Sequence, residues 1–491
     1  MTLPLIRRLA VCGGLFVYLV MARGSLYAEP IGLDSMTPAG AAEKAPQEVE
    51  DAAAVFGKGD YNGAFKHLQE AEKAHPELSP AEVFMAQWFF QAWQQTGQQN
   101  ANLILAMRNW LERGVQRNPD DPEAYLVLGE IALQEGRVTE ADLLYNRAAS
   151  LMKTFKGNTK RKQNLEPRIL GGQAAVGEAR QDWGGAQNLL ETWLKLDAKN
   201  ANIMQRLARA LFQQKKPTES LDMLKKAKEA DSEVLTPEAR LALFYEAFGD
   251  HKNAVKWMEF AIKAAKTDLN TLLVAAQWAL ETEQFDKAKE WAAAAMQHKD
   301  QKSPQAIQAK ILRGVVALFQ QDYKEAEVYF ETAVLQQPTN FAASNNLALA
   351  LIEQSKDPQK QRRALDYAAL NFKTYPRSAE AASTYGWVLY KSGKIEEAER
   401  ALTLALSAGS VSADTAFYLA SVYADPAVDR PEEAKRFLKA ALESKRPFTK
   451  KEDARYLLER LERLTRGSGK SSDSGEKPAA KTDKGGTKKG G

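Results

Sequence analysis

A small side chain, alanine or glycine, returns along this chain at nearly constant intervals. Eight such positions are separated by 34, 34, 34, 38, 34, 38 and 34 residues, namely Ala174, Ala208, Ala242, Ala276, Gly314, Ala348, Gly386 and Ala420. A second small residue usually follows twelve positions later, as at Ala186 and Ala326, and it is delayed to Ala364 and Ala434 in two cases. Small residues repeated once in each of two helices let the helices approach closely, and a fixed repeat length docks each pair on its neighbour in the same way. The spacing therefore predicts an all-α solenoid.

Three segments also match a known repeat pattern at many positions in register. The matching positions are Gly129, Gly136, Ala141, Tyr145 and Ala148 in the first segment; Gly314, Tyr323, Ala326, Phe330, Ala333 and Pro338 in the second; and Tyr385, Gly386, Tyr390, Gly393, Ala398, Leu402 and Ala405 in the third. The pattern resembles the tetratricopeptide repeat. The resemblance implies a right-handed α-α superhelical solenoid of about eleven helix pairs over residues 47–448, closed by a capping helix at 449–466.

One interval is longer than the others. Gly129 and Ala174 are 45 residues apart, and the polar stretch 157–164 lies between them. We interpret that stretch as an inserted loop, which leaves the helices on either side in phase. In the capping helix, the apolar side is predicted to carry Tyr456, Leu457, Leu458, Leu461 and Leu464.

The N-terminal residues have the features of an export signal. Arg7 and Arg8 precede an apolar run of fourteen residues, Leu9 to Ala22, and the segment ends at Ala28. Fourteen residues at about 1.5 Å each fall short of the roughly 30 Å hydrocarbon core of a membrane. We therefore predict a signal peptide at 1–28 and an exported, periplasmic or envelope-associated bacterial protein. The alternative is an uncleaved segment that anchors the chain in the inner membrane.

Low-complexity segments flank the predicted repeats. Residues 29–46 are rich in Ala, Pro and Gly and are predicted to be a flexible linker. Residues 467–491 contain no aliphatic side chain larger than alanine and are predicted to be a disordered tail rich in Lys, Gly and Ser.

The charge distribution argues against nucleic acid as a partner. The net charge is +4, but residues 1–28 and 467–491 each carry +3, so that residues 29–466 carry −2. Binding to duplex nucleic acid requires a clustered basic face. No such partner is expected.

The sequence shows no pattern typical of catalysis. The four histidines, His67, His75, His251 and His298, are spread along the chain, and none has metal-ligand spacing from another. Neither a Gly-rich phosphate loop nor a nucleophile elbow is present. We expect no enzymatic activity, no cofactor and no metal. Cys12 is the only cysteine, and it would leave with the signal peptide.

The resemblance also implies a binding surface. In that family, the first helix of each pair lines a concave groove at five positions per repeat. These correspond to Gln308, Ile311, Val315, Leu318 and Phe319; then Ala342, Asn345, Leu349, Ile352 and Glu353; then Glu380, Ser383, Trp387, Tyr390 and Lys391. The candidate peptide-binding residues are Gln308, Phe319, Asn345, Trp387, Tyr390 and Lys391. Two roles remain open for Trp387: an exposed aromatic anchor for a peptide, or packing against its own or the next helix.

A second candidate surface lies in the degenerate second repeat. Six large aromatic residues crowd residues 84–110, and they surround the helix on more than one side. Either some are exposed as a patch, with Phe84, Trp88 and Trp93 as its members, or all pack into the core.

The resemblance implies a non-catalytic scaffold that binds other proteins in the cell envelope, within assembly or secretion machinery. Two alternatives stay open: a recognition or accessory subunit of an envelope enzyme complex, and a structural spacer. The repeat scaffold specifies the architecture, whereas the partner depends on the side chains that the scaffold presents.

Overall fold

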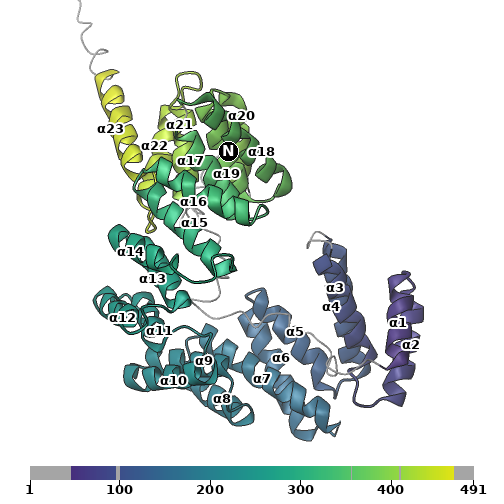
Figure 1. Cartoon of the computed structure of the whole chain (residues 1–491). Coiled ribbons are helices and arrows are strands. Elements are labelled where there is room, and N and C mark those ends of the chain that lie inside the picture. The colour runs from purple at the N-terminus through teal and green to yellow at the C-terminus, as the bar shows by residue number, and fades with distance from the viewer. Residues whose placement is uncertain (1–45, 96–99, 157, 355, 408–410, 469–491) are drawn as a thin grey trace, which may run out of the picture. The chain divides into compact units, whose positions relative to one another are not determined.

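The computed structural model describes residues 46–95, 100–156, 158–354, 356–407 and 411–468. The predicted signal peptide, all but the last residue of the predicted linker, and residues 469–491 of the predicted tail lie outside these ranges. The described residues contain 23 α-helices and no strand (Figure 1). The prediction of an all-α repeat fold is confirmed.

Helices α1–α12 form one compact unit, and helices α13–α23 form a second. The N-terminal unit contains α1 (Gln47–Gly57), α2 (Tyr61–Ala74), α3 (Ala81–Gln95), α4 (Ala101–Arg117), α5 (Pro122–Gln134), α6 (Val138–Thr154), α7 (Thr159–Ala179), α8 (Trp183–Leu196), α9 (Ala201–Gln213), α10 (Pro217–Ala230), α11 (Pro237–Ala247) and α12 (His251–Ala264). The C-terminal unit contains α13 (Leu269–Glu281), α14 (Phe285–Ala295), α15 (Pro304–Phe319), α16 (Tyr323–Gln336), α17 (Phe341–Ile352), α18 (Pro358–Thr374), α19 (Ala379–Lys391), α20 (Ile395–Ser407), α21 (Ala413–Tyr423), α22 (Pro431–Leu442) and α23 (Lys451–Ser468). Each odd-numbered helix up to α21 packs on the helix that follows it.

The small residues lie where the two helices of a pair cross. The alanines of the repeat, such as Ala208, Ala348 and Ala364, are fully buried. Gly314 shows why the position must be small: a Cβ atom there would lie 2.6 Å from Cε1 of Phe330 on the next helix. Carbon atoms in good contact are about 3.5–4.0 Å apart, so a side chain at this crossing displaces its neighbour.

The turn inside a pair has a consistent geometry. At two of these turns, a residue with φ near 60°, Gln181 or Gln321, is followed by an aspartate. Asp182 and Asp322 then cap α8 and α16, each accepting a hydrogen bond at 3.0 Å from the main-chain N–H three residues later. This cap satisfies one of the N–H groups that the first turn of a helix leaves without a partner.

The polar stretch 157–164 is a correction to the sequence interpretation. It is not a loop from residue 159 onward, because α7 begins at Thr159, with Asn158 as its cap. The first turn of α7 buries Arg161, which pairs with Asp121 at 2.9 Å and Glu123 at 2.8 Å. Partners 38 and 40 residues earlier therefore make this polar stretch helical.

Similar ion pairs join first helices of successive repeats in the N-terminal unit. Arg168 on α7 makes a two-point contact with Glu130 on α5, at 3.1 and 2.8 Å. Arg206 on α9 pairs with Glu178 on α7 at 3.0 Å. In this unit, buried arginine-carboxylate pairs connect one repeat to the next. Such pairs fix the orientation of the helices, and removing one partner leaves a buried charge uncompensated.

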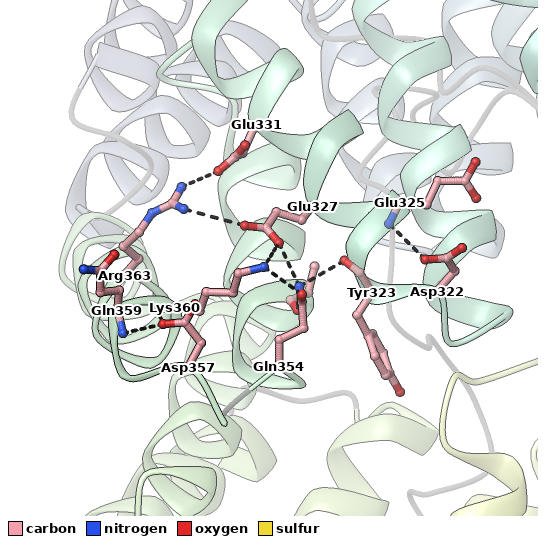
Figure 2. Close-up of polar contacts among 11 residues, drawn as sticks. Asp322, Tyr323, Glu325, Glu327, Glu331, Gln354, Asp357, Gln359, Lys360 and Arg363 are labelled. Carbon is pink, nitrogen blue, oxygen red and sulfur yellow. Dashed lines mark hydrogen bonds and ion pairs between the residues drawn. The ribbon is translucent and has the colours of Figure 1, made fainter.

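A glutamine clasp joins successive repeats in both units. Figure 2 shows the example in the C-terminal unit, where Nε2 of Gln354 donates to the main-chain oxygen of Tyr323 at 3.2 Å and to Glu327 at 2.9 Å. In the N-terminal unit, Gln214 makes the equivalent contacts 31 and 27 residues back, to the oxygen of Trp183 and the side chain of Gln187. Each clasp ties the end of a first helix to the start of the second helix before it.

Helix α23 packs on α22. Its buried side is narrower than the sequence suggested. Ala454 and Leu461 are buried, but Tyr456 is 70% exposed and Leu464 is 62% exposed. The expectation that both lie on the packed side is wrong, because α22, the main helix in contact with α23, covers only one side of it.

Candidate functional site

The first helices of the C-terminal unit contact one another in order: α13 with α15, α15 with α17, α17 with α19, and α19 with α21. Most of the predicted groove positions on these helices are buried. Exposed fractions lie between 0% and 4% for Ile311, Val315, Leu318, Leu349, Ile352 and Trp387. The apolar groove positions thus form packing surface between repeats, and the polar positions carry the candidate site.

Three of the predicted residues meet on α19. Trp387 is 4% exposed, and its ring stacks on Tyr418 of α21 with a centroid distance of 4.3 Å. Tyr390 lies 5.6 Å from the ring of Trp387 and donates its hydroxyl to Asp425 at 3.3 Å. The structure therefore packs Trp387 against the next first helix, which is the second of the two roles considered for it.

The third residue on α19 is Lys391. Its ammonium group lies 5.5 Å from the centre of the Trp387 ring and 3.6 Å from a carboxylate oxygen of Glu353. A cation over an indole face is attracted by the ring quadrupole. This lysine therefore belongs to the same cluster as Trp387.

The other three predicted residues lie one or two helix pairs earlier. Asn345 on α17 is fully buried, and its amide donates to Glu380 at 3.3 Å. Gln308 and Phe319 are half-buried on α15, and the ring of Phe319 stacks on Phe285 with a centroid distance of 5.5 Å. Asn345 therefore connects α17 to the following first helix, α19.

The aromatic residues of the second repeat belong to the core of the N-terminal unit. Phe84 is 4% exposed, so its assignment to an exposed patch is wrong. Trp88 and Trp93 are half-buried and pack on that core, Trp88 against Phe56 at 5.3 Å and Trp93 against Phe90 at 5.7 Å between ring centres. Aromatic rings lie on more than one side of α3 because helices α1, α2 and α4 all pack against it.

Three carboxylates lie on three consecutive first helices. They are Glu353 at the end of α17, Glu380 in the first turn of α19 and Asp414 in the first turn of α21. We call these three residues the acidic cluster. Glu353 accepts a hydrogen bond from the indole N–H of Trp387 at 2.8 Å. An indole cannot neutralise the carboxylate, so Glu353 also requires a cation.

The chain itself supplies such a cation, from the connection between α22 and α23. Residues 448–451, which we call the terminal turn, place the ammonium of Lys450 3.0 Å from Glu353. The same ammonium donates to the hydroxyl of Tyr323 at 2.9 Å and lies 5.2 Å from the centre of its ring. That ring points away from the glutamine clasp (Figure 2). The side chain of Lys450 is only 9% exposed, so its charge depends on these contacts.

The neighbouring residues of the terminal turn bind other helix pairs. Thr449 donates to Asp414 twice, from its main-chain N–H at 3.2 Å and from its hydroxyl at 2.8 Å. Lys451 pairs with Glu283, in the turn after α13, at 2.6 Å. The terminal turn therefore links residues of α21, α17, α16 and the α13–α14 turn within the C-terminal unit.

Burial and neighbouring charges shift the pKa values of this site. Burial and repulsion from Asp414 raise the pKa of Glu380 to about 8. Burial alone would lower the pKa of Lys450, but the Glu353 carboxylate and the Tyr323 hydroxyl overcome it and raise that pKa above its ordinary value. Near neutral pH, Glu380 is therefore mostly protonated, whereas Lys450 stays charged.

Part of this site could have been found from the sequence. Glu353 and Glu380 occupy predicted groove positions, and Asp414 stands 34 residues after Glu380, at the same place in the next repeat. Lys450 carries no comparable signal, because it lies after the last repeat in a connection with no periodic counterpart. Its role follows only from the path of the chain.

Two properties of the described residues concern ligands and membranes. Within these ranges, no group of three or more His, Cys, Asp or Glu side chains is arranged to hold a metal ion. Among the helices that the structure describes, none combines the length and the apolar character of a membrane span.

Family models agree with this architecture in three places. Models of the tetratricopeptide repeat match residues 108–153, 179–242 and 311–379. The matched segments are tetratricopeptide repeats. Proteins of this family are in general interaction scaffolds that bind other proteins. No curated protein shows a significant sequence match to this chain.

Solved structures share the helix-pair fold at low sequence identity. PilF of Pseudomonas aeruginosa is 17% identical, covering 42% of this chain and 90% of its own, with a TM-score of 0.33. PilW, a type IV pilus biogenesis factor, is 19% identical, covering 41% and 89%, with a TM-score of 0.34. Yeast Tom70 is 14% identical, covering 87% and 99%, with a TM-score of 0.35. At these values, the similarities carry no information about the partner of this chain.

Proposed function

We propose that this protein is a non-catalytic scaffold that binds protein segments on the first helices of its C-terminal unit. One observation carries the proposal: side chains from several successive helix pairs converge on the terminal turn and hold it mainly through polar contacts. A surface that binds a segment of its own chain in this way has the chemistry to bind a segment of another protein.

The contacts suit a positively charged segment. Glu353 and Asp414 accept hydrogen bonds from an ammonium group and from a main-chain N–H, which are groups that any lysine-containing segment offers. Charge-assisted hydrogen bonds of this kind are stronger than neutral ones. Several modest contacts spread over neighbouring repeats would give the affinity.

We place this scaffold in the bacterial cell envelope, in assembly or secretion machinery. The support is the N-terminal sequence, where two arginines, a short apolar run and Ala28 follow the pattern of a secretory signal. Retention of that segment as an inner-membrane anchor remains the alternative for localisation. An accessory subunit of an envelope enzyme complex and a structural spacer remain the alternatives for function.

The test is capture of partners by the tagged full-length protein from its own envelope fraction, with mass spectrometry of the recovered proteins. Tyr390→Ala changes the proposed binding surface. Tyr385→Ala is the matched control, because it removes an aromatic ring from the same helix that stacks on Phe372 of α18 instead. We expect partners to be recovered with the wild type and the control and to be lost at least tenfold with Tyr390→Ala.

Other outcomes would contradict the proposal. Partners retained equally by both variants would place binding away from the first helices of the C-terminal unit, and an empty capture would favour the spacer. A catalytic polypeptide among the specific partners would favour the accessory subunit. The mass of the captured protein shows whether the chain is cleaved after Ala28.

A further inference from the structure

We propose that the terminal turn, residues 448–451, is a built-in competitor that occupies the acidic cluster until a lysine-bearing segment of a partner protein displaces it. This inference rests on the proposed function, because it concerns the ligand class and the regulation of the same surface. It makes the scaffold autoinhibited by its own chain.

The contacts of Lys450 define the chemistry that the site accepts. Its ammonium group lies 3.0 Å from Glu353, 2.9 Å from the hydroxyl of Tyr323 and 5.2 Å from the centre of the Tyr323 ring. A compact ammonium has three donors and can satisfy a carboxylate and a hydroxyl while it lies against an aromatic ring. A planar guanidinium matches two-point contacts with carboxylates better than this arrangement. The site is therefore built for lysine.

Neighbouring groups make the cation necessary. The side chain of Glu353 is 9% exposed. It pairs with two ammonium groups, that of Lys450 at 3.0 Å and that of Lys391 at the longer distance of 3.6 Å. Losing the closer of its two cations is costly for a buried carboxylate. Whenever the terminal turn leaves, the site therefore gains most from another lysine that takes the same place.

Thr449 adds a second requirement. Its main-chain N–H and its hydroxyl both donate to Asp414, which is fully buried. A competing segment must therefore bring a hydrogen-bond donor directly before its lysine, and a hydroxyl residue followed by lysine does so. Since α22 ends at Leu442 and α23 begins at Lys451, the turn comprises the last three residues of a short connection and the first residue of α23.

The covalent connection of the turn to α22 and α23 explains why the turn would exclude weak ligands. A segment joined by a short connection has an effective concentration in the millimolar range, so a free peptide of equal intrinsic affinity competes poorly. The apparent affinity of a partner equals its intrinsic affinity multiplied by the fraction of molecules in which the site is free. Releasing the turn should accordingly raise the affinity for a lysine-bearing peptide about 10- to 100-fold.

The experiment uses the full-length protein and a fluorescein-labelled peptide with the sequence of residues 445–456 of this chain. Lys450→Met releases the turn while keeping most of the side-chain volume. Lys445→Met is the matched control, because Lys445 is an exposed lysine in the same connection. By fluorescence anisotropy, we expect the Lys450→Met protein to bind the peptide at least tenfold more tightly than the wild type and the control do.

Two further variants locate the binding. The affinity should return to the wild-type level when Glu353→Gln is added to Lys450→Met, or when the peptide itself carries the Lys450→Met change. Binding that ignores Glu353 would overturn the assignment of the site. A Lys450→Met protein that has an unchanged circular dichroism spectrum, but binds the peptide no better than the wild type does, would overturn the proposal that the turn competes for the site.

A wild-type measurement covers the case in which Lys450→Met fails to fold. Brief acetylation followed by mass spectrometry should modify Lys445 readily and Lys450 slowly, and millimolar unlabelled peptide should make Lys450 reactive. If Lys450 stays protected from acetylation in the presence of the peptide, the proposal that the peptide displaces the turn is wrong. The envelope capture is repeated in the Lys450→Met background, where the turn does not compete, and partners lost there with Tyr390→Ala support the scaffold whether or not the turn is a competitor. Failure of the competitor and failure of the scaffold are therefore distinguishable.

Discussion

Replacing Gly314 by alanine tests whether the repeat register sets the packing of the C-terminal unit. A Cβ atom at Gly314 would lie 2.6, 2.8 and 3.0 Å from three carbon atoms of the Phe330 ring. The usual contact distance is about 3.5 Å or more, so the ring must move by roughly 1 Å. Because Phe330 is fully buried, the ring cannot turn into solvent to make that room.

The expected cost follows from two opposing terms. Overpacking a well-packed crossing costs about 1–3 kcal/mol, and a clash with three ring atoms belongs to the upper part of that range. Alanine in place of glycine inside a helix stabilises by about 1 kcal/mol. We therefore expect Gly314→Ala to lower the free energy of unfolding by about 1–2 kcal/mol, measured by urea denaturation followed by circular dichroism.

Two controls separate the clash from the helix propensity. Gly184 is also helical, but the nearest atom to a Cβ there is 4.0 Å away, so Gly184→Ala should stabilise by up to about 1 kcal/mol. Phe330→Leu should make room at the crossing, and in that background Gly314→Ala should cost at least about 1 kcal/mol less than in the wild type. If the Gly314→Ala single variant is as stable as the wild type or more stable, the assignment of Gly314 to a tight helix crossing is wrong.

Two further predictions concern charged residues. Because the pKa of Glu380 is raised to about 8, the folded protein binds this proton more tightly than the unfolded chain does, and its stability falls as the pH rises from about 5 to 8. Glu380→Gln should therefore stabilise the protein by about 2 kcal/mol at pH 9 after allowance for partial exposure, and hardly at pH 5; equal effects at both pH values in urea denaturation would contradict this pKa. Arg161→Met should cost about 3–5 kcal/mol, since it leaves Asp121 and Glu123 without their buried cation, whereas a melting temperature within 1–2 °C of the wild type would show that the pairs contribute little.

Periodicity predicted the parts of the fold that depend on one repeat and its neighbour. The positions of Ala208, Ala348 and Gly314 marked the helix crossings, because only small residues fit there whatever the rest of the chain does. The carried-over groove positions likewise placed Glu353 and Glu380 on first helices, where the acidic cluster lies. The same reasoning could not tell a buried groove position from an exposed one, as Trp387 shows.

Two sequence-based expectations that the structure does not bear out, for residues 157–164 and for Phe84, fail for the same physical reason. The stretch 157–164 is polar, which favours a loop locally, but Asp121 and Glu123 lie far back in the chain and stabilise Arg161 inside a helix. Phe84 was open to an exposed position because its own helix has too many rings for one stripe, yet neighbouring helices bury it. In both cases the deciding partners lie outside the sequence window that carries the pattern.

The sequence by itself determined the helix-pair repeat, its register and the small residues at each crossing, since these follow from spacing that is visible along the chain. Only the tertiary structure decided what occupies the acidic cluster. Lys450 reaches Tyr323 across 127 residues, and Lys451 reaches Glu283 across 168. The path of the C-terminal unit creates those contacts, and a local pattern of residues cannot encode them because their energy depends on burial and charge contributed by several helix pairs at once.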